Sequence, residues 1–137
     1  MLREFFETLQ DELSGIGPTV KVAIPPKENS SPDGEGESSK EEITIYLTCV
    51  NMEKIDRVNN YVKIRVLITA YYKEELEGET MYLDALEALD DIINYLDENK
   101  RNYNLIATPE SMTNNIWSTF RTQLRPFLMY ECPVSLA

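Results

Sequence analysis

Carboxylates are the side chains of this sequence whose number and spacing could do chemistry. Many of them gather in one stretch of the chain: Glu74, Glu75, Glu77, Glu79, Asp84, Glu87, Asp90, Asp91 and Asp97. On a helix, Glu87 and Asp91 would be neighbours one turn apart. Paired carboxylates can act as general acid and base, and carboxylate oxygens can hold Mg²⁺. The alternative that we favour is a solvated helix face opposite an apolar one.

Other catalytic chemistry lacks the residues it needs. The sequence contains no histidine, which excludes Ser–His and Cys–His nucleophile pairs and histidine metal ligands. Two cysteines, Cys49 and Cys132, cannot build a four-ligand zinc site by themselves, and we expect two buried thiols rather than a disulfide. The five glycines form no phosphate-binding loop. We therefore expect no catalytic residue, cofactor or metal, and we expect that the chain is not an enzyme.

The charge balance limits the classes of partner. Asp and Glu number 24 against 13 Lys and Arg, for a net charge of −11. Such a field repels nucleic-acid phosphates and anionic lipids, so neither is an expected partner. Solubility alone would explain the acidity, and a basic partner is the alternative. Because the sequence shows neither a signal peptide nor a long apolar run, we expect no membrane insertion and folding in the cytoplasm.

The chain has the length of a single domain, residues 1–137. Apolar residues at helical spacing predict a first helix that Gly15 and Gly17 end, and a short strand follows at residues 19–24. Residues 27–42 contain no apolar side chain and predict a mobile acidic loop. This loop is either a tolerated insertion or an arm that becomes ordered on a partner.

Two period-two patterns, at residues 43–49 and 62–70, predict an antiparallel hairpin across a polar connection at about residues 51–60. A long helix is predicted next, with Thr80 as its N-cap. Its apolar stripe is Tyr82, Leu83, Leu86, Leu89, Ile92, Ile93 and Leu96. We expect this stripe to cover a sheet, and an exposed coiled-coil seam is the alternative.

The last third predicts a short strand at residues 103–107, a helix that begins at Pro109, and a final strand at residues 127–134. Pro133 places the final strand at a sheet edge or ends it there. The predicted fold class is α+β, a mainly antiparallel sheet of about four to five strands packed against two to three helices.

Five segments together resemble a known family. They are LREFFETLQDEL, EEITIYLTCVNMEKI, NNYVKIRVLITAYY, YLDALEALDDIINYL and NNIWSTFRTQLRPFLMYECPV. In this order they resemble the conserved N-terminal domain of the terminator, or cap, proteins of phage-derived contractile injection systems. The most specific part is the closing stretch, with Asn115–Trp117, Arg125–Pro126 and Tyr130. The acidic loop is not part of the family's pattern, and many relatives carry a further segment whose function we expect this chain to lack.

The resemblance implies a phage tail-terminator-like fold and a structural function without catalytic residues. Such proteins form a sixfold ring that ends tube polymerisation and anchors the last sheath ring. The implied partners are copies of the chain itself, the inner tube and sheath proteins and the tape-measure protein. The implied location is a phage tail-like particle assembled in the cytoplasm and then released or membrane-anchored.

A ring requires that one surface of the subunit meets a different surface of its neighbour, and sheet edges suit such joints. We expect the final strand and the strand that begins at Tyr61 to be edges. The candidate interface residues are Trp117, Arg121, Arg125, Phe127 and Tyr130. The alternatives are a core position for the tryptophan and weak surface ion pairs for the arginines.

Two other functions stay open. A non-enzymatic α+β adaptor module would bind a basic protein or peptide. A small carboxylate-dependent hydrolase would need acids that line a pocket and a divalent metal.

Overall fold

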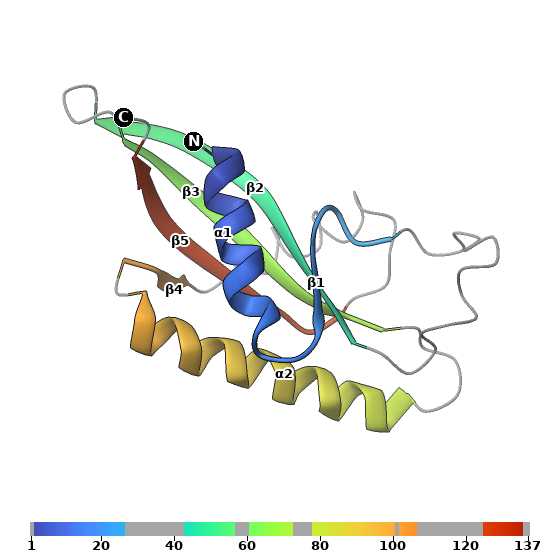
Figure 1. Cartoon of the computed structure of the whole chain (residues 1–137). Helices are drawn as coiled ribbons and strands as arrows, with labels where there is room; N and C mark the ends of the chain where they lie inside the picture. The colour runs from blue at the N-terminus through green and yellow to red at the C-terminus, as the bar shows by residue number, and fades with distance from the viewer. Residues whose placement is uncertain are drawn as a thin grey trace.

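A five-stranded sheet with two helices makes up the part of the chain that the computed structural model describes, residues 2–26, 43–56, 61–72, 78–100, 102–106 and 125–135. The predicted loop at residues 27–42 lies outside these ranges, and so does the predicted helix after Pro109. Figure 1 shows the first helix in front of the sheet and the second along its lower side.

The first helix, α1 (Leu2–Ser14), ends as the sequence predicts and leads into β1 (Thr19–Val22). The chain turns between them at Gly17, whose φ of 143° is a conformation that glycine adopts far more readily than other residues. Gln10 of α1 donates a hydrogen bond from Nε2 to the carbonyl oxygen of Val20 at 2.8 Å. The helix is therefore fixed against the strand that follows it.

The sheet has the strand order β1-β2-β3-β5-β4. β2 (Thr44–Asp56) and β3 (Tyr61–Tyr71) form the predicted antiparallel hairpin, and β5 (Phe127–Ser135) pairs antiparallel with both β3 and β4 (Asn104–Ile106). The pairing of β1 with β2 is parallel. The predicted fold class, a mainly antiparallel α+β fold, is confirmed.

β2 is longer than the sequence pattern indicated. Residues 51–56, expected to be a polar connection, continue the strand and pair with β3 as far as Tyr61. A register shift between Cys49 and Asn51 marks a bulge at Val50. The period-two pattern breaks at the bulge, since one extra residue moves every later side chain to the other face.

Both predicted edge strands were wrong. β3 lies in the centre of the sheet, and β5 lies between β3 and β4. Pro133 fits because β4 pairs only with Met129–Glu131, which leaves β5 with one described neighbour at the proline. The edges are the short strands β1 and β4, and a parallel pairing of β1 with β2 could not be read from a local pattern.

The second helix, α2 (Gly78–Asn99), begins two residues before the predicted cap. Its buried face is also rotated from the predicted stripe. The buried positions are Met81, Ala85, Ala88, Leu89, Ile92 and Leu96. Tyr82, Leu83 and Leu86 are exposed instead. The two small alanines allow α2 to approach the sheet closely, so volume as well as hydrophobicity decided which face is buried.

Both helices contribute to one core on a single face of the sheet. From the helices come Phe6, Leu9 and Leu13 together with the buried positions of α2; from the strands come Val20, Ile45, Leu47, Ile64, Val66, Ile68, Ala70, Tyr130, Cys132 and Val134. The predicted alternation along β3 is confirmed at Ile64, Val66 and Ile68. An ion pair between Lys100 and Glu12, with Nζ and Oε2 3.2 Å apart, joins the end of α2 to α1.

Candidate functional site

The carboxylates of α2 whose side chains the structure describes lie on its solvent side. Asp84, Glu87, Asp90, Asp91 and Asp97 are all exposed. The described residues contain no group of three or more acids, cysteines or histidines arranged to hold a metal ion. Glu74, Glu75 and Glu77 lie outside the described residues. The solvated face that we favoured from the sequence is therefore confirmed at these five positions.

The two thiols differ from each other. Both are free; Cys132 is buried as predicted, whereas Cys49 is exposed and the prediction of a buried thiol there was wrong. Cys49 lies next to the bulge in β2, two residues beyond Leu47, the last residue of β2 that pairs with β1. Burial raises the pKa of the Cys132 thiol to about 12, so this group stays protonated and unreactive at neutral pH.

Arg125 lies two residues before β5 and is buried, with only 6% of its surface exposed. Its guanidinium carbon lies 5.3 Å from the ring centre of Tyr71 and 5.0 Å from that of Tyr72. Its Nε donates a hydrogen bond to the carbonyl oxygen of Tyr72 at 3.1 Å. The next residue, Pro126, accepts a hydrogen bond from the amide of Ala70. These contacts attach the start of β5 to the end of β3.

The other candidate interface residues have different positions. Phe127 is half-buried at the start of β5, opposite Thr69 of β3. Tyr130 is in the core with 1% of its surface exposed, and its hydroxyl has no hydrogen-bond partner among the described residues. Burial raises the pKa of Tyr130, and the charge of Asp97 raises it further. Trp117 and Arg121 lie outside the described residues.

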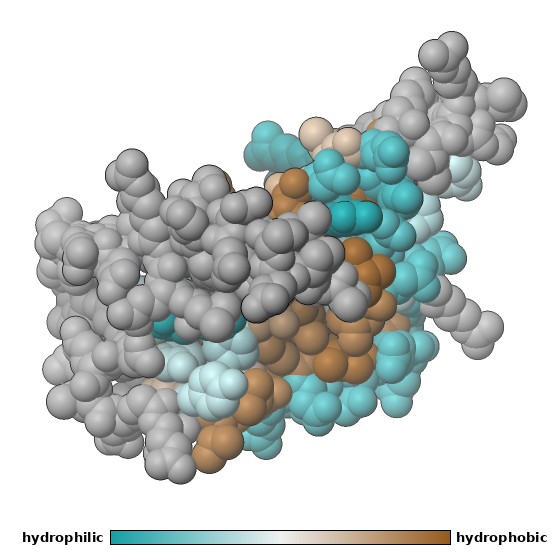
Figure 2. Space-filling model, turned by 180° about the vertical axis from the view of Figure 1, so that it is seen from behind, coloured by the Kyte–Doolittle hydropathy of each residue, from teal (hydrophilic) through white to brown (hydrophobic). Residues whose placement is uncertain are grey.

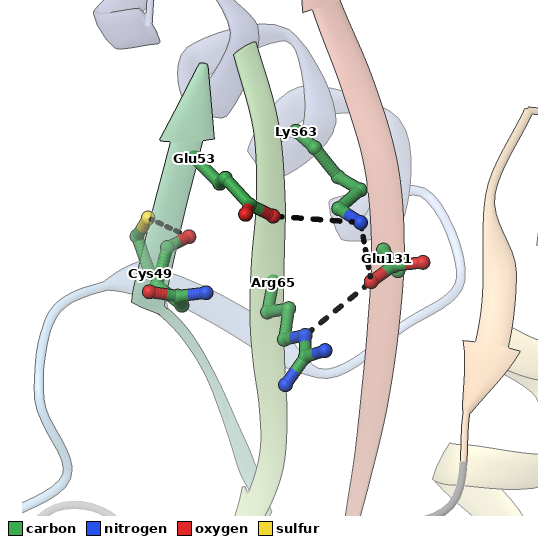
Figure 3. A network of polar contacts seen from close by, with 6 residues as sticks. Cys49, Glu53, Lys63, Arg65 and Glu131 are labelled. Carbon is green, nitrogen blue, oxygen red and sulfur yellow. Dashed lines mark hydrogen bonds and ion pairs between the residues drawn. The ribbon is translucent and has the colours of Figure 1, made fainter. Parts of the chain in front are cut away.

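A row of four charged side chains crosses three strands (Figure 3). Arg65 donates from Nε to Oε2 of Glu131 at 3.3 Å, and Lys63 Nζ lies 3.7 Å from the same oxygen. Lys63 Nζ also lies 3.6 Å from Oε1 of Glu53. The row is on the face away from the helices, since the alternating residue Ile64 is in the core.

This charged row is electrically neutral in a chain with a net charge of −11. Lys63, Arg65 and Glu131 are partly exposed and Glu53 is exposed. Each pair therefore contributes at most about 1 kcal/mol to folding. The sequence showed Lys63 and Arg65 as the polar side of a strand, but their acidic partners became visible only with the pairing register.

β2 and β5, the strands next to the short edge strands, both extend beyond the residues that β1 and β4 pair with. β1 pairs with Thr44, Ile45, Tyr46 and Leu47 of β2 alone, so β2 from Thr48 to Asp56 has no described strand on its outer side. Cys132, Pro133 and Val134 of β5 likewise have no described strand on the side of β4. Unpaired strand backbone can be completed by another chain, and the sequence missed the β2 segment because it predicted a loop there.

A hydrophobic groove of about 290 Å³ lies between α2 and the start of β5. Its apolar lining comes from Tyr82, Leu86, Leu89, Ile93, Pro126, Phe127 and Leu128. Figure 2 shows hydrophobic surface directly above a hydrophilic lower edge, where α2 runs in Figure 1. Neither α1 nor α2, the helices of the described part, has the length and hydrophobicity to cross a membrane.

Comparison with known proteins finds similarity in structure. No known protein family and no curated protein matches the sequence. Among solved structures, the cap of the anti-feeding prophage, a tube terminating cap, matches 99% of the chain with a TM-score of 0.60 and 12% identity. The sheath/tube terminator of PVC, an extracellular contractile injection system in its extended state, matches 100% of the chain with a TM-score of 0.65 and 12% identity.

The matched region is a little over half of each of those proteins, 54% of the first and 57% of the second. At 12% identity the likeness concerns the fold. The resemblance found in the sequence is thus confirmed at the level of fold.

Proposed function

We propose that this protein is a non-enzymatic structural subunit that caps the distal end of the inner tube and sheath of a contractile injection system. The observation that carries the proposal is the match of nearly the whole chain to a tube terminating cap and to a sheath/tube terminator. Because one fold can serve several functions, the surface must also suit assembly. Three surfaces suit assembly: the outer side of β2 from Thr48 to Asp56, which has no described strand beside it, the charged row on β2, β3 and β5, whose net charge is zero, and the apolar groove beside α2.

The arrangement that we propose is a ring of six copies. The ring ends tube polymerisation and anchors the last sheath ring. Each copy must offer two different surfaces to its neighbours. Residues 48–56 of β2 and residues 132–134 of β5, which have no described strand on their outer sides, lie towards opposite edges of the sheet, which supports a head-to-tail contact.

The proposed contact residues fall into two groups. Trp117, Arg121 and Phe127 are proposed to contact a neighbouring subunit or partner. Arg125 and Tyr130 are buried in the single chain, so we propose that they contribute by holding β5 in place for such contacts.

The proposed partners beyond other copies of the chain are the inner tube and sheath proteins and the tape-measure protein. Assembly is proposed to take place in the cytoplasm, as part of a phage tail-like particle that is released or membrane-anchored.

Deletion of the gene followed by electron microscopy of the particles tests the proposal. We expect tubes of uncontrolled length, or sheaths that detach or fail to assemble. Complementation with Arg3→Ala, a change at an exposed position on α1, should restore normal particles, whereas Phe127→Asp should restore fewer. Particles of normal length and intact sheath in the deletion strain would contradict the capping role.

A second candidate function is an adaptor that binds a basic protein or peptide. The observation that favours it is the acidic, partly apolar surface of α2. Normal particles in the deletion strain, together with binding of a basic protein by the purified chain, would favour the adaptor over the cap.

A further inference from the structure

The solvent side of α2 carries large apolar side chains that are exposed in the part of the chain that the structure describes. Tyr82, Leu83 and Leu86 have 47%, 57% and 41% of their surfaces exposed. The same helix uses Met81 and Ala85 to cover the sheet. Exposed apolar residues that are grouped in this way commonly mark an interaction site.

The spacing of these residues defines the shape of the occupant. Tyr82, Leu86, Leu89 and Ile93 follow one another at intervals of four, three and four residues. This is the spacing with which one helix packs along another. At 1.5 Å per residue the stripe extends over about 16 Å, or three helical turns. All four residues line the groove of about 290 Å³: Tyr82 and Leu86 are exposed, Ile93 is partly exposed, and Leu89 is mostly buried, with 4% of its surface exposed. Phe127 and Leu128 of β5 form part of the wall of the groove.

The charge around the stripe defines the chemistry of the occupant. α2 contains no Lys or Arg, and its acids are Glu79, Asp84, Glu87, Asp90, Asp91, Asp97 and Glu98. Asp90 itself lines the groove. A second copy of α2 would place like charges opposite one another, and anionic lipid or nucleic acid would be repelled. Basic side chains beside an apolar stripe are complementary to this surface.

We propose that the stripe Tyr82–Leu86–Leu89–Ile93, with the wall formed by Phe127 and Leu128, is a docking site for a basic amphipathic helix of a protein partner. The partner helix packs its apolar residues along α2 and places Lys or Arg beside Asp90 and its acidic neighbours. This is the helix-in-groove mode of recognition. The site is a property of the chain itself and does not depend on a capping role.

Three synthetic peptides test the site on the purified full-length chain. One is a helical Lys/Leu peptide of roughly 20 residues, long enough to form a helix, with leucines at intervals of three and four. The second has Glu in place of Lys. The third is a scrambled Lys/Leu peptide of the same composition without the apolar stripe. We expect the patterned Lys/Leu peptide to bind at least about tenfold more tightly than the other two, and more weakly as salt is raised.

Variants locate the binding. Tyr82→Ser together with Leu86→Gln should weaken the patterned peptide at least about tenfold, since every 1.4 kcal/mol of lost contact is a factor of ten. Leu105→Gln on β4 is the matched control, because that leucine is 50% exposed and lies outside the groove. Asp90→Asn with Glu87→Gln should reduce the salt dependence while the fold is kept, as amide NMR spectra would show.

Several results of these binding experiments would overturn the proposed docking site. Equal binding of the patterned and scrambled peptides would overturn the proposal, because charge alone would then explain it. So would binding that Leu105→Gln reduces as much as the α2 variant does, or no binding at all. Self-association of the chain that Leu86→Gln abolishes would assign the stripe to a second copy instead. None of these results depends on particle assembly, so the test is separate from gene deletion.

Discussion

At the scale of single residues, Arg125 shows how burial changes a role that the sequence suggested. From the sequence, Arg125 was a candidate interface residue, and a weak surface ion pair was the alternative. In the structure its guanidinium lies over Tyr71 and Tyr72, and its Nε bonds to a main-chain carbonyl oxygen. A sequence does not reveal which strand ends meet, so this contact could not be predicted.

Arg125→Ala is expected to lower the free energy of unfolding by about 2–4 kcal/mol. The change removes two cation–π contacts and a buried hydrogen bond to a charged donor. Urea denaturation measures the effect. The control is Arg3→Ala, whose exposed i,i+4 pair with Glu7 contributes no more than about 0.5 kcal/mol. Equal losses for the two variants would show that the Arg125 contacts do not stabilise the fold.

The two cysteines are expected to react very differently with a thiol reagent. In the native protein Cys49 should be modified readily, while Cys132 should react only after unfolding, since the first is exposed and the second is buried. Cys49→Ser should remove the fast reaction. Fast modification of two thiols in the folded protein would contradict the position of Cys132 in the core.

The buried Cys132 thiol also predicts how stability depends on pH. Burial raises its folded pKa from 9.0 to about 12, so the unfolded state loses its proton first. The contribution of this thiol to the free energy of unfolding is fully present below about pH 9 and is lost as pH rises towards 12. Thermal unfolding of Cys132→Ala should show a smaller fall in Tm over that window than the wild type. An identical fall would assign the alkaline loss to other groups.

At the scale of elements, the connection from α1 to β1 depends on one glycine. Gly17→Ala is expected to cost about 1–3 kcal/mol, because φ there is 143° and a side chain makes that conformation strained. Gly15→Ala is the matched control, since its added Cβ would lie 3.5 Å from the carbonyl oxygen of Glu12, an ordinary contact. Chemical denaturation of both variants gives the comparison, and a Gly17→Ala variant as stable as Gly15→Ala would contradict the account of this turn.

Local sequence patterns predicted well where helices and strands lie along the chain, but predicted poorly which strands are neighbours in the sheet. The ends of α1, the hairpin of β2 with β3 and the short strand β4 followed from periodicity and glycine positions. The full length of β2 was hidden by a bulge, which breaks the alternation at Val50. The prediction of the edge strands was wrong because β1 and β4 take their positions through pairing with segments that are distant in the sequence.

For the candidate site on α2, the sequence likewise predicted one feature correctly and another wrongly. The acidic side of α2 was recognised from the sequence and is exposed as expected. The phase of its apolar stripe was wrong, since Ala85 and Ala88 cover the sheet where larger residues were expected to do so. That difference of phase leaves Tyr82 and Leu86 on the surface, and it creates the groove beside β5.

At the scale of the whole molecule, the acidity of the chain is unevenly distributed. α2 carries seven acids and no base, whereas the row of Glu53, Lys63, Arg65 and Glu131 on the opposite face of the sheet is neutral. Surfaces of different charge let one subunit meet different partners without self-repulsion. The proposed cap, which would contact a tube, a sheath and its own copies, requires such differences.

Reconstruction of the end of the assembled particle by cryo-electron microscopy tests the capping role most directly. Particles purified from cells that make this chain should show, at one end of the tube and sheath, a closed ring into which the sheet and both helices of the described fold can be placed. Absence of the chain from both ends of the particle, or its presence along the whole tube, would contradict the proposed function.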